Sequence, residues 1–266
     1  MAVVTTAGIQ TVALDEVLVR YEPRIAVITI NRPQAKNAVT RAVSEGIATA
    51  LDELDRRDDL SVGIITGAGG SFCAGMDLKG FLRGERPSIE GRGFAGLTEA
   101  PPKKPLIAAV EGYALAGGCE IVLACDLVVA GRTAKFGIPE VKRGLVAAAG
   151  GLMRLPHRIP QQIAMELALT GDMITAERAY QVGLVNRLAE DGGALEAAFA
   201  LAATIAANGP LATLASKRVI VEHEQWPEAE RFARQRGIIE PVFRSEDAKE
   251  GARAFAEKRQ PNWQGR

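Results

Sequence analysis

The sequence predicts an α/β region followed by a helical region. Up to about residue 140, short apolar runs typical of strands alternate with helical patterns, as in α/β folds. Beyond residue 159 only helical patterns remain, separated by glycine and proline. With 266 residues, the chain is long enough for a sizeable core, as one large domain or as one domain with an appendage.

The first half contains five predicted strands and two predicted helices. Residues 17–21 and 25–31 read as a strand pair joined by a turn at Pro23. Apolar residues then recur at helical spacing behind Thr40, a candidate N-cap, and this helix ends in the charged run 55–59. The remaining elements are strands at 62–66, 107–110 and 127–130, with a helix at 117–125 between the last two.

The second half is predicted to be helical throughout. Prolines and glycines mark the expected ends of its helices. The helices are predicted at 161–169, 176–182, 195–207, 211–222, 228–239 and 246–258, with breaks at Gly171, Gly209, Pro210, Pro227 and Pro241. Before this region, residues 82–104 have little periodicity, which fits either a mobile surface loop or a flap over a binding site.

Composition excludes several classes of function. Lys and Arg together number 32, as do Asp and Glu, so no global field favours nucleic acid or an anionic membrane. Three cysteines form no pairing framework and two histidines form no metal-ligand cluster, so we expect no metal and a reducing cytoplasm. Residues 1–15 lack the basic residues of a leader. The apolar stretch 105–130 is interrupted by three acidic residues and does not read as a membrane span.

Two glutamates follow segments suited to a binding site. Glu120 ends the run Gly112-Tyr113-Ala114-Leu115-Ala116-Gly117-Gly118-Cys119-Glu120, in which small residues let the backbone approach a ligand closely. Glu140 follows Pro139, which fixes the chain direction before the acid. Each glutamate has a simpler explanation as an acid in the first turn of a helix.

A third segment changes the interpretation of both glutamates. It reads Ser71-Phe72-Cys73-Ala74-Gly75-Met76-Asp77-Leu78-Lys79. With the two glutamate segments it resembles the crotonase (enoyl-CoA hydratase/isomerase) superfamily, and most closely the enoyl-CoA hydratases. Matching segments extend in order along nearly the whole chain, at residues 25–33, 36–38, 150–156, 169–171, 177–179, 183–186 and 255–259.

The resemblance implies a fold and an assembly. Residues 1–200 are expected to form a spiral of ββα units, and residues 201–266 a C-terminal helical region that mediates trimerisation. The protein is then a homotrimer or homohexamer. A phosphate-binding loop at residues 67–70 is rejected, because neither the third glycine of the dinucleotide motif nor a Gly-Lys-Ser/Thr follows.

The resemblance also implies an activity in fatty acid metabolism, the reversible hydration of a 2-enoyl-CoA. The backbone N–H groups of Met76 and Gly117 are expected to form the oxyanion hole. Glu120 is expected to activate water, and Glu140 to deliver a proton. The expected substrate-binding residues are Lys36, Ala38, Ala74, Met76, Asp77, Leu78, Lys79, Gly117, Ala148 and, across a subunit boundary, Lys258. Coenzyme A is part of the substrate, and no cofactor is expected.

Three alternatives remain open. An enoyl-CoA isomerase would use Glu140 alone, and a carnitinyl-CoA-dehydratase-like enzyme would be a specialised hydratase. A non-catalytic member that binds acyl-CoA or RNA is the third, although the paired carboxylates and zero net charge argue against it. The chain departs from the common hydratase pattern where Ala147 and Ala148 replace a Pro-Gly pair, which puts acyl-chain specificity in doubt.

Overall fold

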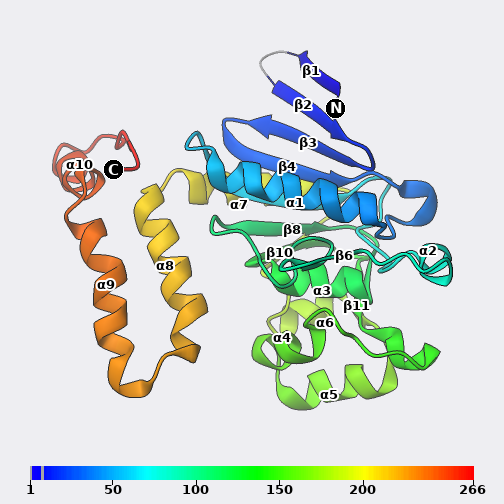
Figure 1. Ribbon diagram of the computed structural model, residues 1–266. Coiled ribbons are helices and arrows are strands. Elements are labelled where there is room, and N and C mark those ends of the chain that lie inside the picture. Colours follow the sequence, from blue (N-terminus) through cyan, green and yellow to red (C-terminus); the bar gives the residue numbers. More distant parts are fainter. Residues whose placement is uncertain (1, 7–8) are drawn as a thin grey trace.

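A computed structural model describes residues 2–6 and 9–266, and within them an eight-stranded sheet organises most of the chain before residue 190 (Figure 1). Its order is β1-β2-β3-β4-β5-β8-β10-β13. The first four strands form an antiparallel meander, and the strands from β4 onward pair in parallel. The strands are β1 (Ala2–Thr6), β2 (Ile9–Leu14), β3 (Val17–Glu22), β4 (Arg24–Ile30), β5 (Leu60–Gly67), β8 (Leu106–Val110), β10 (Leu127–Gly131) and β13 (Arg187–Ala189).

The chain also contributes strands to a second, smaller sheet, and by alternating between the two sheets it forms a spiral. The smaller sheet has the order β12-β11-β9, with β9 at Tyr113–Leu115, β11 at Lys135–Gly137 and β12 at Ile174–Thr175. Each turn of the chain places one strand in the large sheet and the next in the small one, as in β8-β9 and β10-β11. Isolated bridges from Val39 to Met76 and from Cys73 to Ala114 extend the same layer. This confirms the predicted spiral of ββα units. A short hairpin, β6 (Ser88–Ile89) with β7 (Gly93–Phe94), lies apart from both sheets.

Two helices cover the two faces of the large sheet. Alternate residues of β4 point to opposite faces, so Ala26 and Ile28 belong to one core cluster and Ile25 and Val27 to the other. Helix α1 (Arg41–Arg56) packs on the first face through apolar residues that are almost fully buried, and Thr40 caps it by accepting the N–H of Val43. Helix α7 (Ala194–Ala206) packs on the second face.

The other elements of the core are short. The helices are α2 (Leu78–Leu82), α3 (Gly117–Ala124), α4 (Gly151–Arg158), α5 (Gln161–Thr170) and α6 (Ala176–Gln181), with 3-10 helices η1 (Pro33–Ala35) and η2 (Pro139–Arg143). Helices α3, α5 and α6 confirm three predicted helices. Helix α4 was not predicted, because its start at Gly150 and Gly151 suits a turn equally well and Pro156 lies inside it.

The last helices form an arm, defined as residues 210–266. It contains α8 (Pro210–Glu222), α9 (Arg231–Phe243) and α10 (Glu246–Ala256), with 3-10 helices η3 (His223–Gln225) and η4 (Glu228–Glu230) between the first two. In Figure 1 the arm stands beside the core as a helical hairpin topped by α10. The predicted division between residues 200 and 201 lies within α7, and the trimerisation role of the region after it stays a prediction.

One predicted helix end is wrong. Pro241 was expected to break the chain, but it lies inside α9. Proline there removes one hydrogen bond to the carbonyl of Gly237. Helix α9 has no buried residue among its members, so water can satisfy that carbonyl and the helix continues.

Among the described residues, no single helix is long and apolar enough to cross a membrane. Helix α7 and the segment Pro210–Gln225 pass the length and composition criteria only as a pair that is bent by 107°.

Candidate active site

A cavity of about 430 Å³ lies between the start of α3, helix η2 and the segment before α2. Both predicted catalytic glutamates line it. Its walls are formed by Ala74, Met76, Leu78, Phe81, Arg86, Pro87, Ser88, Phe94, Glu99, Leu115, Ala116, Gly117, Glu120, Pro139, Glu140, Arg143, Leu145, Val146, Ala148 and Ala149. Segments far apart in the sequence therefore meet at one concave site, which is the usual form of a small-molecule site.

Glu120 is held in this cavity by backbone groups. It lies in the first turn of α3 and is 3% exposed. The N–H groups of Ala149 and Gly151 donate to its Oε1 at 2.7 and 2.8 Å. Burial raises its pKa to about 7, which these two donors oppose, while nearby Glu140 raises it further. A Cβ at position 151 would lie 3.0 Å from the same oxygen, so glycine is what allows the approach.

Glu140 reaches the cavity from η2, directly after Pro139. Its Oε2 is buried and has no hydrogen-bond partner within residues 2–6 and 9–266. Burial raises the pKa of its carboxyl group, and a backbone hydrogen bond and the charge of Arg143 oppose this rise. A buried, unpartnered carboxylate oxygen is costly unless a ligand or water meets it.

The N–H groups of Met76 and Gly117 border the same space. Gly75 O and Asp77 N pair with Val39, at 2.8 and 3.0 Å, so the N–H of Met76 points to the opposite side of its strand. Gly75, the residue before Met76, lies against the start of α3, since a Cβ on Gly75 would be 3.3 Å from Gly117 N. Gly117 is the first residue of α3, and its N–H therefore has no acceptor within the helix.

The backbone is strained at the residue immediately before α3. Ala116, the N-cap residue of α3, has φ 52° and ψ −128°, a conformation that favours glycine. Such strained residues cluster at functional sites, where the surrounding structure holds them in place. A Cβ on Gly117 would meet the Phe94 ring at 2.5 Å, so glycine at this position also leaves room for Phe94.

The predicted substrate-binding residues fall into two groups. Ala74, Met76, Leu78, Gly117 and Ala148 line the cavity. Ala148 has no positive φ, so its replacement of glycine requires no strained backbone. The other predicted residues, Lys36, Ala38, Asp77, Lys79 and Lys258, do not line it.

The residues outside the cavity have other contacts. Lys36 lies 4.8 Å from the centre of the Tyr113 ring, and its carbonyl accepts the N–H of Ala74 at 3.0 Å. Asp77 caps α2 by accepting the N–H groups of Lys79 and Gly80, so its carboxylate is already engaged. Lys258 follows α10 in the arm, and within one chain the structure does not bring it to the cavity.

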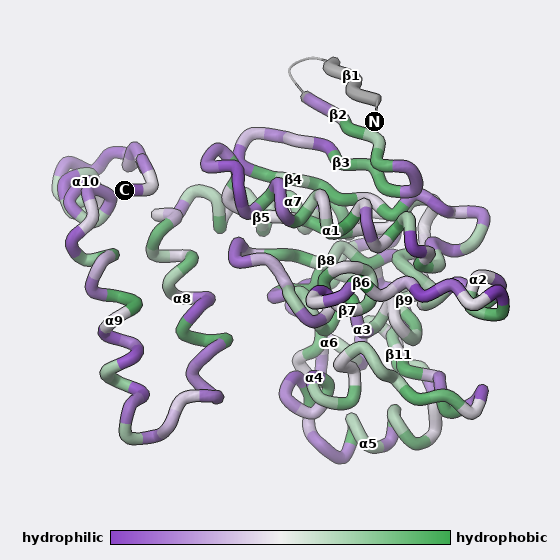
Figure 2. Tube along the Cα trace, in the orientation of Figure 1, coloured by the Kyte–Doolittle hydropathy of each residue, from purple (hydrophilic) through white to green (hydrophobic). Residues whose placement is uncertain are grey.

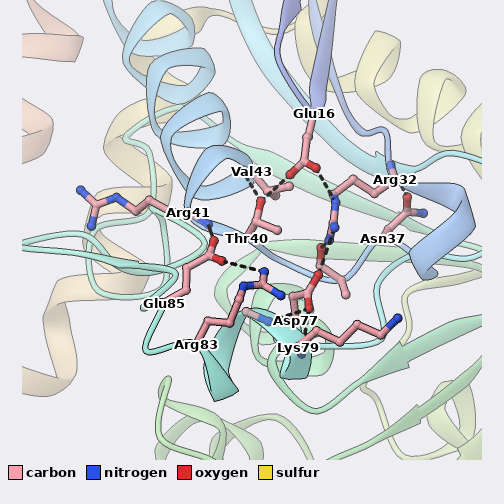
Figure 3. Close-up of polar contacts among 12 residues, drawn as sticks. Glu16, Arg32, Asn37, Thr40, Arg41, Val43, Asp77, Lys79, Arg83 and Glu85 are labelled. Carbon is pink, nitrogen blue, oxygen red and sulfur yellow. Dashed lines mark hydrogen bonds and ion pairs between the residues drawn. The ribbon is translucent and has the colours of Figure 1, made fainter.

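Figure 3 shows a polar network behind the Met76 segment. The guanidinium of Arg32 donates to Ala38 O at 2.6 Å and to Asp77 Oδ2 at 3.0 Å, and it pairs with Glu16 at 2.6 Å. Thr40, the N-cap of α1, donates its hydroxyl proton to the other oxygen of Glu16. The Arg32 side chain is 13% exposed, so this network joins β4, the start of α1 and the start of α2 with little contact with water.

Sequence reasoning missed several residues of the cavity wall. Residues 82–104, here called the covering segment, contribute Arg86, Phe94 and Glu99 to it. Phe94 and Leu97 are also buried in the core, so this part of the covering segment is not a mobile surface loop, and the flap over the binding site stays a prediction. Arg143 was missed as well, although it follows Glu140 by three residues and so lies on the same face of a 3-10 helix.

No group of three or more His, Cys, Asp or Glu side chains within the described ranges is placed to hold a metal ion. The three cysteines are free and buried.

Comparison with known proteins finds relatives along nearly the whole chain. A family model for enoyl-CoA hydratase/isomerase matches residues 20–266. Enoyl-CoA hydratase EchA19 of Mycobacterium tuberculosis is 45% identical over 262 residues, covering 94% of this chain and 97% of that protein. Carnitinyl-CoA dehydratase of Salmonella typhimurium is 43% identical over 250 residues, covering 90% of this chain and 94% of that protein.

A solved structure is more similar still. The crystal structure of an enoyl-CoA hydratase from Mycobacterium tuberculosis H37Rv superposes with a TM-score of 0.93 at 65% identity, covering 94% of this chain and 99% of that one.

Proposed function

The chain belongs to the enoyl-CoA hydratase/isomerase family, the crotonase superfamily that its motifs resemble, and we propose how its residues carry out the activity of an enoyl-CoA hydratase. The enzyme adds water reversibly across the 2,3 double bond of a 2-enoyl-CoA thioester. One observation carries the assignment of residues: two carboxyl groups and two backbone N–H groups that have no acceptor among residues 2–6 and 9–266 border a single cavity.

The N–H groups of Met76 and Gly117 stabilise the thioester oxygen. When water attacks C3, negative charge moves through the conjugated system to this oxygen and an enolate forms. Preorganised donors aimed at the developing charge are each worth about 10²- to 10³-fold in rate. The position of Gly117 at the N-terminus of α3 adds the positive end of the helix dipole to this stabilisation.

The glutamates move the protons. Glu120 takes a proton from the attacking water, and Glu140 delivers a proton to C2, so that one proton is accepted and one donated in each addition. Only one oxygen of Glu120 receives the backbone donors, which leaves its Oε2 for water. Burial raises the pKa of both groups, and two neighbouring carboxyl groups titrate as a coupled pair.

The coenzyme A part of the substrate lies outside the catalytic cavity. We assign its adenosine diphosphate to the backbone of Lys36, Ala38 and Ala74, with Lys79 near the phosphates. The carboxylate of Asp77 is engaged with Arg32 and α2, so Asp77 contributes through its backbone, next to Leu78. Lys258 of a neighbouring subunit completes the site. The reaction transfers no electrons, and no cofactor is proposed.

The wider setting follows from the same assignment. We propose a homotrimer or homohexamer of the cytoplasm that acts in fatty acid metabolism and binds neither nucleic acid nor a membrane. The apolar side chains exposed along the arm support association, and the three free cysteines support a reducing compartment.

Replacement of each glutamate by glutamine tests the assignment. Glu120→Gln and Glu140→Gln keep the shape of the side chain and remove its proton transfer, so each is expected to lower kcat by roughly 10²- to 10⁴-fold with little change in substrate binding. The assay follows the loss of the conjugated enoyl absorbance for crotonyl-CoA and longer thioesters.

Three outcomes would change the assignment. Near wild-type turnover by either variant would rule out the two-carboxylate mechanism. An enzyme that shifts a 3-enoyl to a 2-enoyl double bond, and that needs only Glu140 for it, would support the isomerase alternative. Activity confined to thioesters with a quaternary ammonium group would favour the carnitinyl-CoA dehydratase alternative.

A further inference from the structure

Three charged side chains other than the catalytic pair line the cavity: Arg86, Glu99 and Arg143. A site for a plain hydrocarbon chain is expected to be lined by apolar groups, because charges that lose water on ligand binding must be paired to avoid a cost. All three side chains are exposed to solvent at the cavity wall, so a ligand that reaches one of them must either pair its charge or displace its water at a cost.

Arg143 occupies the decisive position. It is the last residue of η2, whose second residue is Glu140. A 3-10 helix has three residues per turn and rises about 2 Å per residue, so Arg143 lies on the same face about 6 Å further along. It is close enough for its charge to lower the pKa of Glu140. Leu145 and Val146 continue the wall beyond it.

Arg143 has no ion pair or side-chain hydrogen bond with another described residue. Its neighbour Lys142 provides the contrast, because Lys142 pairs with Asp172 at 2.6 Å and does not line the cavity. Of these two neighbouring cations on η2, Lys142 therefore pairs outside the cavity, and Arg143 lies on the cavity wall without an ion pair to another described residue.

The covering segment contributes a second cation. The guanidinium of Arg86 lies 5.0 Å from the centre of the Phe81 ring and donates to a backbone carbonyl. Glu99 is the one further carboxylate of the wall, and no ion pair joins it to either arginine among residues 2–6 and 9–266. Apart from the catalytic pair, the wall thus carries two positive charges and one negative charge.

We propose that the acyl group of the substrate carries a carboxylate at its far end, which Arg143 binds. The substrate class is then the 2-enoyl-CoA thioesters of dicarboxylic acids. This inference rests on the proposed function, because the oxyanion hole and the two glutamates fix the thioester and the double bond, and Arg143 lies one helical turn beyond Glu140. Arginine is suited to the task, since its planar guanidinium binds a carboxylate through two parallel hydrogen bonds.

The test compares kcat/KM for three thioesters of similar length. One ends in a methyl group (crotonyl-CoA), one in a carboxylate (the CoA thioester of trans-2-pentenedioic acid) and one in a quaternary ammonium group. The wild-type enzyme is expected to prefer the carboxylate. Arg143→Leu is expected to lower the ratio of kcat/KM for the carboxylate to that for the methyl thioester by about 10- to 100-fold, the usual worth of a charged hydrogen-bonded contact. Lys142→Leu, the matched control, removes a cation from the same helix and is expected to leave the ratio unchanged.

Each other result has a distinct meaning. A wild-type preference for the methyl or the ammonium thioester would overturn the inference, as would an unchanged ratio in Arg143→Leu. An equal rise of KM for all three thioesters would show that Arg143 binds the coenzyme A part instead, and would also overturn it. A wild-type enzyme that hydrates none of the three, nor any longer 2-enoyl-CoA, would contradict the proposed function itself.

Discussion

Glu120 combines a catalytic position with an unfavourable environment. It is almost fully buried, and its hydrogen bonds come from two backbone N–H groups rather than from a cation. Burial disfavours the ionised carboxylate and raises the pKa to about 7. A buried carboxyl group of this kind lowers the stability of the fold at any pH at which it is ionised. Functional sites commonly lower the stability of their proteins in this way.

The sign of this effect gives a prediction for Glu120→Gln. The pKa is about 7 in the folded protein and ordinarily 4.5, so between these values the folded state binds more protons than the unfolded state, and stability falls as pH rises. Each pKa unit is worth about 1.4 kcal/mol, so the full effect above pH 7 is roughly 3 kcal/mol. Glutamine keeps the acceptor for both N–H groups and cannot ionise. The variant is therefore expected to be more stable than wild type at pH 8, and to lose this advantage toward pH 4.5.

Chemical denaturation at fixed protein concentration measures the effect at several pH values. Glu166→Gln on the exposed side of α5 is the control. A Glu120→Gln protein that is no more stable than wild type at pH 8 would contradict the raised pKa.

Sequence reasoning identified both glutamates but not their surroundings. Glu120 and Glu140 stand in segments whose glycines and proline are visible in the sequence. The donors to Glu120 come from residues 149 and 151, about thirty positions later, and nothing local links these positions. Arg143 is one of many charged residues, and only the face of η2 on which it lies distinguishes it from Lys142.

At the scale of elements, the oxyanion hole depends on the contacts that hold the Met76 segment in place. The N–H of Met76 belongs to a short segment with only a single bridge to Val39. Arg32 ties both sides of that bridge, through Ala38 O and the side chain of Asp77 (Figure 3). Asp77 follows Met76 directly and fixes the start of α2. We therefore infer that Arg32 is a positioning residue for the Met76 N–H.

Arg32→Met is expected to lower kcat by about 10-fold or more, short of the 10²- to 10³-fold cost of losing an oxyanion donor completely. The bound enoyl thioester supplies a second measurement. Polarisation of its carbonyl by the oxyanion hole shifts the enone absorbance to longer wavelength, and this shift is expected to shrink in the variant. Arg32→Lys, which keeps the charge, is expected to restore part of it.

Arg56→Met is the control, because Arg56 is 70% exposed at the end of α1, where it pairs with Glu53 of the same helix. A purely structural role for Arg32 predicts a lower melting temperature with an unchanged absorbance shift, and that result would refute the positioning role.

The elements that were predicted correctly are those with enough length to show a period. Helix α1 buries residues at helical spacing behind a threonine cap, and β4 and β5 are continuous apolar runs. The strands of the small sheet have two or three residues each, too few to show alternation. These short strands nevertheless carry the site, because β9 leads into Gly117 and β11 leads into Glu140.

At the scale of the whole molecule, the arm leaves much apolar surface uncovered. Phe232, Phe243 and Phe255 are 74%, 77% and 87% exposed, and Figure 2 shows hydrophobic residues interrupting the hydrophilic ones along α8 and α9. On the core, α4 and α5 expose Met153 and Leu169 at 70% each. Monomeric proteins rarely leave so many large apolar side chains in water.

Light scattering at micromolar concentration is therefore expected to give the mass of a trimer or hexamer. Replacing two arm residues, in the variant Phe232→Asp/Phe243→Asp, is expected to lower that mass, because a charge in an apolar interface must be desolvated. Arg234→Asp places the same acidic side chain on the opposite side of α9 from Phe232 and Phe243 and is expected to keep the wild-type mass. Because Lys258 is proposed to reach the coenzyme A of a neighbouring subunit, the dissociated variant is also expected to show a higher KM while its cavity, which lies within one chain, keeps both glutamates. A monomeric wild-type protein, or a double variant of unchanged mass, would refute the role of the arm in assembly.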